Sequence, residues 1–212
     1  MVWHPSSRRC RNPRSSAAMT FRLGLTGSIG MGKSTTAKMF ADEGCDVWDA
    51  DRAVHRLYEP GGAAVEQLGA AFPGVIVDGA VDRDQLKTHL ANHPGDFKQL
   101  EEIVHPLVGA DRANFIANAK SDILVFDIPL LFETGGNKNM DAVICVSVPP
   151  DIQRSRVLAR GTMTEDQFIQ ILAKQMPASE KCAQSDYVIM TDTLDHAREQ
   201  VRAVIHDIKS RL

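Results

Sequence analysis

Residues 27–34 read GSIGMGKS and have the residue types and spacing of a loop that binds phosphate groups. Gly27, Gly32, Lys33 and Ser34 fill the pattern G-x-x-x-x-G-K-[ST], between an apolar run and a helical run. Glycines let backbone N–H groups approach an anion, and the N-terminal end of the following helix adds positive potential. Lys33 would reach the β- and γ-phosphates and the Ser34 hydroxyl would ligate Mg²⁺. The loop predicts a bound nucleoside triphosphate but does not say where a phosphate goes.

Acidic residues follow two further apolar runs. Asp49 and Asp51 end the second run, where a carboxylate could accept a proton from an attacking hydroxyl or hold Mg²⁺ through water. Asp51 could instead cap the helix that begins at RAVHRLY. Asp127 ends the third run, where it could face the metal or simply cap the strand. The residue types alone leave these alternatives open.

Arginines gather on one predicted short helix, at Arg154, Arg156 and Arg160. Gly161 follows, and then a second helix that we expect Thr164 to cap. The planar fork of arginine binds phosphoryl oxygens bidentately, so the pair of helices predicts a hinged lid over the nucleotide. A solvated basic helix face is the alternative.

Three histidines are candidates for metal or ligand binding. His89 and His93 are four residues apart, but no glutamate completes an H-E-x-x-H arrangement, so we expect no metal site there. His105 precedes Pro106, which we expect to cut or bend a helix after Val104. The pattern does not decide whether His105 binds a ligand or packs.

Short apolar runs alternate with amphipathic ones and predict an α/β fold with a parallel sheet. The final helical run has an apolar stripe that predicts core packing, formed by Leu194, Ala197, Val201, Val204, Ile205 and Ile208. The predicted strands are FRLGLT (21–26), CDVWD (45–49), DILVFD (122–127), DAVICVSV (141–148) and DYVIM (186–190).

About seventy residues separate the second and third strands, far more than one crossover helix needs. Their pattern is helical, so we expect a helical insertion over about 60–120 at the carboxyl edge of the sheet. Such an insertion is where an α/β enzyme would bind a second substrate.

Composition limits the class of protein. The 212 residues carry a formal net charge of −3, which gives no basic field of the kind that marks nucleic-acid binders. The four cysteines are far apart in sequence and predict reduced thiols in a cytoplasmic protein, and no apolar run is long enough to span a membrane. Residues 1–18 carry four arginines and no acid. We interpret them as a disordered extension in preference to an organellar transit peptide, with Met19 as the start of the fold.

Taken together, LGLTGSIGMGKST, VWDADRAVHRLYEPG, IVHPLV, DIPLLFE and IQRSRVLARGTMTEDQFIQILAKQ resemble the dephospho-coenzyme A kinases, a family of P-loop kinases. The resemblance runs in colinear order from Phe21 to the C-terminus. It implies a three-layer αβα fold with a five-stranded parallel sheet, a helical substrate-binding insertion and a helical lid over about 154–183, in a single domain spanning 19–212. It also implies transfer of the γ-phosphate of ATP to the 3′-hydroxyl of dephospho-CoA.

The resemblance assigns roles to residues of this chain. Asp51 would be the base, Lys33 would hold phosphates, and Arg160 would meet the transferring phosphoryl group. Asp49, Asp51, His105 and Leu130 would bind the acceptor, and Ser34 would ligate Mg²⁺, with Asp127 acting through water. The nucleotide-binding residues would be Gly27, Ser28, Ile29, Gly30, Met31, Gly32, Lys33, Ser34 and Thr35.

The sequence departs from the family pattern at two places. The turn Met190-Thr191-Asp192 lacks the Asn-rich ending that the family leads us to expect next to the adenine, and Ile171 stands where some relatives carry an arginine. Another small-metabolite or nucleoside monophosphate kinase is the alternative function. A nucleotide switch is a further one, although no N-K-x-D motif is present. We expect a monomer or small homo-oligomer with no nucleic-acid or membrane partner.

Overall fold

The computed structural model describes residues 20–212, so the extension predicted over 1–18 and the expected start at Met19 lie outside the described residues. The described chain forms two compact units. The first contains residues 20–47 and 120–212, and the second is Trp48–Ala119.

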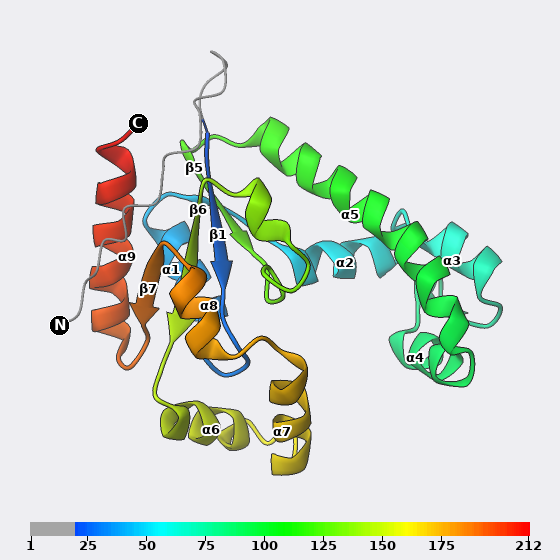
Figure 1. The fold of residues 1–212 in the computed structure, drawn as a ribbon. Helices are drawn as coiled ribbons and strands as arrows, with labels where there is room; N and C mark the ends of the chain where they lie inside the picture. Colours follow the sequence, from blue (N-terminus) through cyan, green and yellow to red (C-terminus); the bar gives the residue numbers. More distant parts are fainter. Residues whose placement is uncertain (1–19) are drawn as a thin grey trace. The chain divides into compact units, whose positions relative to one another are not determined.

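A five-stranded sheet is the centre of the first unit. Its strand order is β2-β5-β1-β6-β7, and β1 pairs in parallel with both β5 and β6, as β6 does with β7. Figure 1 shows the arrangement. The strands are β1 (Phe21–Thr26), β2 (Asp46–Asp49), β5 (Ile123–Asp127), β6 (Ala142–Ser147) and β7 (Tyr187–Met190). The predicted parallel α/β sheet is confirmed, and every strand end lies within one residue of the sequence prediction.

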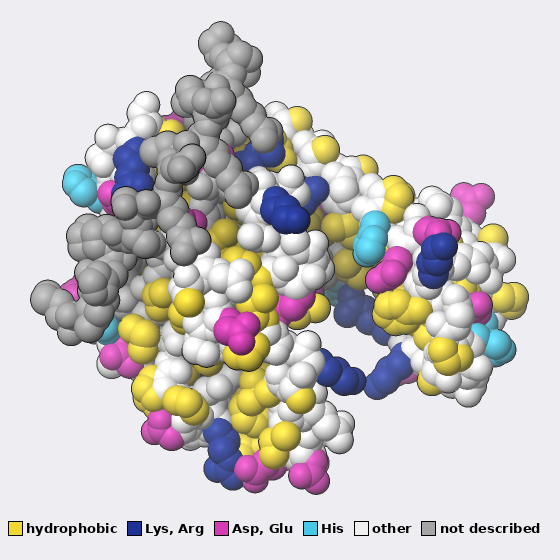
Figure 2. Space-filling view, in the orientation of Figure 1, with side chains coloured by type: hydrophobic (Ala, Val, Ile, Leu, Met, Phe, Trp, Pro, Cys, Tyr) yellow, Lys and Arg dark blue, Asp and Glu magenta, His cyan; other side chains and the backbone are white. Residues whose placement is uncertain are grey.

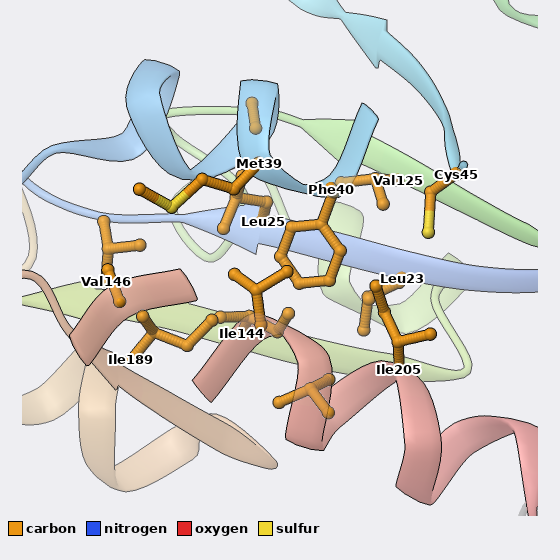
Figure 3. Close-up of a cluster of buried hydrophobic side chains, with 14 of the residues drawn as sticks. Leu23, Leu25, Met39, Phe40, Cys45, Val125, Ile144, Val146, Ile189 and Ile205 are labelled. Atoms are coloured by element: carbon orange, nitrogen blue, oxygen red, sulfur yellow. The ribbon is translucent and has the colours of Figure 1, made fainter. Parts of the chain in front are cut away.

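Helices α1 (Lys33–Asp42) and α9 (Leu194–Lys209) cover one face of the sheet. Alternate strand residues point to this face, so Leu23 and Ile144 meet Phe40 of α1 and Ile205 of α9 in one apolar cluster (Figure 3). Phe40 has no solvent-exposed surface, and burial of such a side chain contributes about 2 kcal/mol. The cluster holds the start of α1 at the carboxyl edge of β1.

The predicted apolar stripe of α9 is confirmed except at one position. Ala197, Val201, Val204, Ile205 and Ile208 are buried, whereas Leu194 is 62% exposed. Leu194 is the first residue of α9, one turn before the first buried position, so it projects beyond the surface that the sheet covers.

The opposite face of the sheet packs against α8 (Ala178–Gln184) and the turn before β6. Cys145 of β6 points to this side, and its Sγ lies 3.5 Å from the Sγ of Cys182 in α8. Both thiols are free, although nothing in their sequence spacing indicated that they would meet. The remaining elements of this unit are α6 (Pro150–Ala159), α7 (Glu165–Lys174) and the 3-10 helix η2 (Gly136–Asn139).

The second unit is mostly helical and has a core of its own. Buried residues such as Leu68, Phe72 and Val104 form this core. Its helices are α2 (Ala50–Tyr58), α3 (Val65–Ala71), α4 (Arg83–Asn92), the 3-10 helix η1 (Pro94–Asp96) and α5 (Phe97–Asn118).

A β-hairpin interrupts these helices and was not predicted. β3 (Ile76–Val77) and β4 (Ala80–Val81) pair antiparallel around Asp78 and Gly79, which have φ angles of 50° and 79°. An Asp-Gly pair between short apolar runs favours this turn, because both central residues need positive φ. The signal was present in the sequence, at VIVDGAV.

We expected Pro106 to cut or bend a helix after Val104, and the first of these, a cut, is wrong. α5 continues through Pro106 for 22 residues. Proline removes one backbone hydrogen bond and costs about 3 kcal/mol inside a helix. Packing of Val104, Leu107 and Val108 on the core of the second unit offsets that cost.

Charges of both signs are interspersed among the described side chains on the face drawn in Figure 2. Within residues 20–212, the structure contains no helix whose length and apolar character would allow it to cross a membrane.

Candidate active site

The phosphate loop leaves β1 and turns directly into α1. Gly32 caps α1 with φ of 87°, a left-handed conformation that favours glycine, and its lack of a side chain leaves the first-turn N–H groups uncapped. Gly30 also has positive φ, at 79°, and a Cβ there would lie 2.4 Å from Val157 Cγ2 of α6. The loop therefore requires glycine at both positions and presents backbone donors suited to phosphate.

Side chains from elsewhere in the first unit fix the loop. The Gln153 Nε2 donates to the Ile29 carbonyl at 2.7 Å, and the Ile29 N–H donates to Gln175 Oε1 at 3.3 Å. Thr191 Oγ1 donates to the Met31 carbonyl at 2.7 Å. Sequence reasoning missed the two glutamines. Thr191 lies in the turn that departs from the family pattern. In the structure it is buried and supports the phosphate loop through this hydrogen bond.

Lys33 and Asp127 form an ion pair at the carboxyl ends of β1 and β5. Asp127 is 1% exposed and the Lys33 side chain 15%. The first residue of α1 is thus in contact with the last residue of β5. Ser34 and Thr35 lie exposed in the first turn of α1.

The segment DIPLLFE is tied down by a buried lysine that the sequence analysis missed. Lys181 of α8 has no exposed side-chain surface and contacts the Pro129 carbonyl at 3.1 Å and Glu133 Oε1 at 2.9 Å. Thr26 Oγ1 donates to the same carbonyl at 2.9 Å. Burial by itself would raise the pKa of Glu133, but hydrogen bonds from the Met176 N–H and Lys181 outweigh it and hold the pKa below its usual value. Leu130, in the same turn, is 43% exposed.

The structure separates the three arginines of the predicted lid. Arg154 donates to Glu165 Oε1 at 2.6 Å and so joins α6 to α7. Arg156 donates to the Thr191 carbonyl at 2.6 Å, beneath the loop. Arg160 is exposed at the end of α6, and we find no side-chain partner for it within the described residues.

The turn between these helices confirms the expected cap. Gly161 has φ of 64°, and Thr164 caps α7 in a capping box with Gln167. This short, glycine-containing connection is compatible with a hinge.

Asp49, and not Asp51, caps α2 in the second unit. Asp49 Oδ1 accepts the Arg52 N–H at 2.9 Å, so the proposed capping role for Asp51 is wrong. Asp51 occupies the first turn of α2 and is exposed, with no ion-pair partner in the part of the chain that the structure describes. The cap lies two residues earlier than Asp51 because the backbone of Asp49 is extended, as the last residue of β2, and α2 begins directly after it.

Asp111 of α5 positions α2 and was also missed. It accepts from Trp48 Nε1 at 2.7 Å and from the Arg56 guanidinium at 2.7 Å. Burial would raise the pKa of Asp111, but these donors outweigh it and lower the pKa. His105 lies exposed on the same helix.

Comparison with known proteins decides the family. The family model described as "Dephospho-CoA kinase" matches residues 21–196. The chain is 67% identical to the dephospho-CoA kinase of Ruegeria pomeroyi over 91% of this chain and 98% of that one. The chain belongs to the dephospho-CoA kinase family.

A second relative and a solved structure agree with this assignment. The Cereibacter sphaeroides dephospho-CoA kinase is 57% identical over 89% of this chain and 96% of that one. The crystal structure of TT1252 from Thermus thermophilus superposes with a TM-score of 0.79 at 29% identity, covering 89% of this chain and 97% of that one. Membership of the dephospho-CoA kinase family confirms the resemblance and the fold class, and identifies the chain as a kinase in place of a nucleotide switch.

Proposed function

We propose that this chain transfers the γ-phosphate of ATP to the 3′-hydroxyl of dephospho-CoA, giving CoA and ADP. The observation that carries the proposal is the family match over residues 21–196, which includes the phosphate loop, Asp49, Asp51 and the lid helices. Each proposed role belongs to side chains of one of the two units.

In the first unit, the loop amides and Lys33 hold the β- and γ-phosphates. The Lys33 ammonium forms an ion pair with the Asp127 carboxylate, and this pair keeps the lysine side chain at the end of the loop. The remaining members of the cradle are Gly27, Ser28, Ile29, Gly30, Met31, Gly32, Ser34 and Thr35. Fixed donors of this kind stabilise the charge of the transferring group without reorganisation.

The oxygen donors of this unit fit Mg²⁺. The hydroxyl of Ser34 is exposed in the first turn of α1, and the carboxylate of Asp127 ends the adjacent strand beside Lys33. Ser34 would bind the ion directly and Asp127 through water. When bound, Mg²⁺ would neutralise charge on the phosphate oxygens.

Asp51 is the proton acceptor. The 3′-oxygen bonds to the γ-phosphorus, the bond from that phosphorus to the β–γ bridging oxygen breaks, and the hydroxyl proton passes to the Asp51 carboxylate. Asp51 is suited to this role because Asp49 provides the helix cap and Asp51 is exposed. A base that remains accessible at a helix start can meet a substrate hydroxyl.

Arg160 is the lid arginine that meets the phosphoryl group. Arg154 and Arg156 are engaged with Glu165 and Thr191, whereas Arg160 is exposed beside the Gly161 turn. Residues 154–183 would act as the lid and exclude water, which competes as an acceptor.

Asp49, His105 and Leu130 also bind the acceptor, with the insertion over about 60–120 as the main acceptor-binding region. Asp49 uses Oδ1 for the α2 cap, and we find no other partner for its carboxylate within residues 20–212. His105 and Leu130 offer an exposed imidazole and an exposed apolar side chain. We infer a cytoplasmic enzyme that works on small molecules.

ADP release by the purified chain with Mg-ATP tests the proposal. Dephospho-CoA is compared with a panel of nucleoside monophosphates and with water alone, and the product is identified by mass. We expect stimulation by dephospho-CoA only, with CoA as the product. Stimulation by a monophosphate, or hydrolysis indifferent to every acceptor, would overturn the proposed substrate.

A further inference from the structure

Two histidines and an aspartate meet in the second unit, and none of the three has a role in the proposed kinase reaction. His89 lies in the last turn of α4, His93 follows that helix, and Asp96 ends η1. One potential ligand atom from each side chain lies within 4.8 Å of the other two. Sequence reasoning expected no site here because it tested only H-E-x-x-H spacing, which does not reach Asp96.

Hydrogen-bond distances within this cluster indicate which nitrogen of His93 is available to bind a metal. His89 Nε2 lies 2.7 Å from Asp96 Oδ2. His93 Nδ1 lies 3.1 Å from the His89 carbonyl oxygen, and because that oxygen only accepts, Nδ1 carries the hydrogen. The lone pair of neutral His93 therefore belongs to Nε2. A histidine that binds a metal through one nitrogen typically donates its other N–H to such a carbonyl or carboxylate.

We propose that His89, His93 and Asp96 bind a Zn²⁺ ion, with water in the fourth position. Two imidazoles and a carboxylate are a donor set that Zn²⁺ accepts at about 2.0–2.2 Å, and this set disfavours Mg²⁺, which prefers oxygen ligands. Tetrahedral bonds of that length separate ligand atoms by about 3.3 Å. The observed separations of 2.7 Å and up to 4.8 Å bracket that distance, so side-chain rotation alone assembles the site.

Packing holds one member of the cluster, His89, beside the core of the second unit. The ring of His89 lies 5.2 Å from the ring of Phe72, which is fully buried in the core of the second unit, and 4.6 Å from the ring of His93. His93 is exposed and belongs to no hydrophobic core, and its contacts are with the ring and the carbonyl oxygen of His89. A bound ion would link the end of α4 to the residue that precedes α5.

Titration of tag-free protein with Zn²⁺, measured by isothermal titration calorimetry, tests the proposal. His93→Gln is the main variant because His93 is exposed, and His206→Gln, on the exposed surface of α9, is the matched control. We expect one Zn²⁺ per wild-type chain, at least about tenfold weaker binding in His93→Gln, and wild-type binding in His206→Gln. Zinc bound equally by wild type and His93→Gln, or not bound by wild type, would overturn the site.

Thermal unfolding supplies a second readout, using Asp96→Asn. A ligand that binds only the folded state raises the melting temperature. We expect ZnCl₂ to raise the melting temperature of the wild type, chelator to reverse the rise, and Asp96→Asn to lose most of it, with MgCl₂ inactive at the same concentration. An equal rise in Asp96→Asn, or an equal response to MgCl₂, would contradict the proposal.

Discussion

The two units of the chain hold the groups of the proposed reaction in opposite ways. In the first unit, the phosphate loop and Lys33 are fixed by buried partners, among them Asp127, Gln153 and Thr191. In the second, Asp51 and His105 are exposed on helices whose positions depend on a separate core and on Asp111.

The difference follows from what each group must do. Phosphates carry concentrated charge, and donors stabilise that charge in the transition state only if they need no reorganisation. A proton acceptor for a substrate hydroxyl must instead remain accessible until the substrate arrives. The comparison therefore separates stability from activity: changes in the first unit should affect both, and changes to exposed groups in the second should affect activity alone.

Substitution Asp51→Asn is expected to have the largest effect on turnover. Loss of the proton acceptor should lower kcat by about 10²–10⁴-fold. The melting temperature should remain that of the wild type, because Asp51 is exposed and Asp49 caps the helix. Steady-state kinetics with dephospho-CoA and thermal unfolding measure the two quantities.

Asp84→Asn is the matched control, since Asp84 is another exposed acid in the first turn of a helix of the same unit. Its kcat should match the wild type. Normal turnover by Asp51→Asn would remove the base assignment and leave Asp51 a positioning role at most.

Substitution Lys33→Met should lower both activity and stability. Loss of one donor to the transferring phosphates should reduce kcat by about 10²–10³-fold. It also removes the ammonium beside Asp127, which is 1% exposed, and breaking a buried pair costs about 3 kcal/mol. Denaturant titration and steady-state kinetics give both values.

The double variant Lys33→Met/Asp127→Asn separates the two effects. Neutralising Asp127 should restore much of the free energy of unfolding, while activity stays low. If Lys33→Met alone unfolded with wild-type free energy, the buried pair would not support the loop as the comparison requires.

Substitution Asp111→Asn should have the smallest effect, confined to the second unit. The neutral amide weakens the hydrogen bonds from Trp48 and Arg56, and because the Arg56 side chain is 50% exposed, solvent screens that pair. We expect a loss of about 1 kcal/mol in the free energy of unfolding. Hydrogen exchange of residues 48–119 locates the loss, and Glu101→Gln on the same helix should show none.

The difference in stability between wild type and Asp111→Asn should depend on pH with a definite sign. The pKa of folded Asp111 is lowered, so the carboxylate stabilises the fold above its unfolded pKa of about 3.9. That stabilisation is lost as the pH falls through the folded pKa. Wild type and Asp111→Asn should converge in stability in strong acid, and a difference that grew on acidification would contradict the role of Asp111.

Local patterns predicted the parts of the molecule that local physics controls. The glycine spacing of the loop, the alternation of the strands and the Thr164 cap each depend on a few consecutive residues, and each is found in the structure. The Asp78-Gly79 hairpin had an equally local signal and was overlooked. The capping role left open for Asp51 belongs to Asp49, because both residues are acceptable caps and only the end of β2 distinguishes them.

The sequence by itself determined that the chain carries a phosphate loop at the carboxyl edge of a parallel sheet, and its motifs predicted the kinase family to which it belongs. The tertiary structure alone decided which residues become partners: Lys181 with Glu133, Gln153 with Ile29, Asp111 with Trp48, and Asp96 with His89. Most of these pairs join residues far apart in the chain. Their contacts depend on how separate elements pack, and no short-range pattern of residue types encodes that packing.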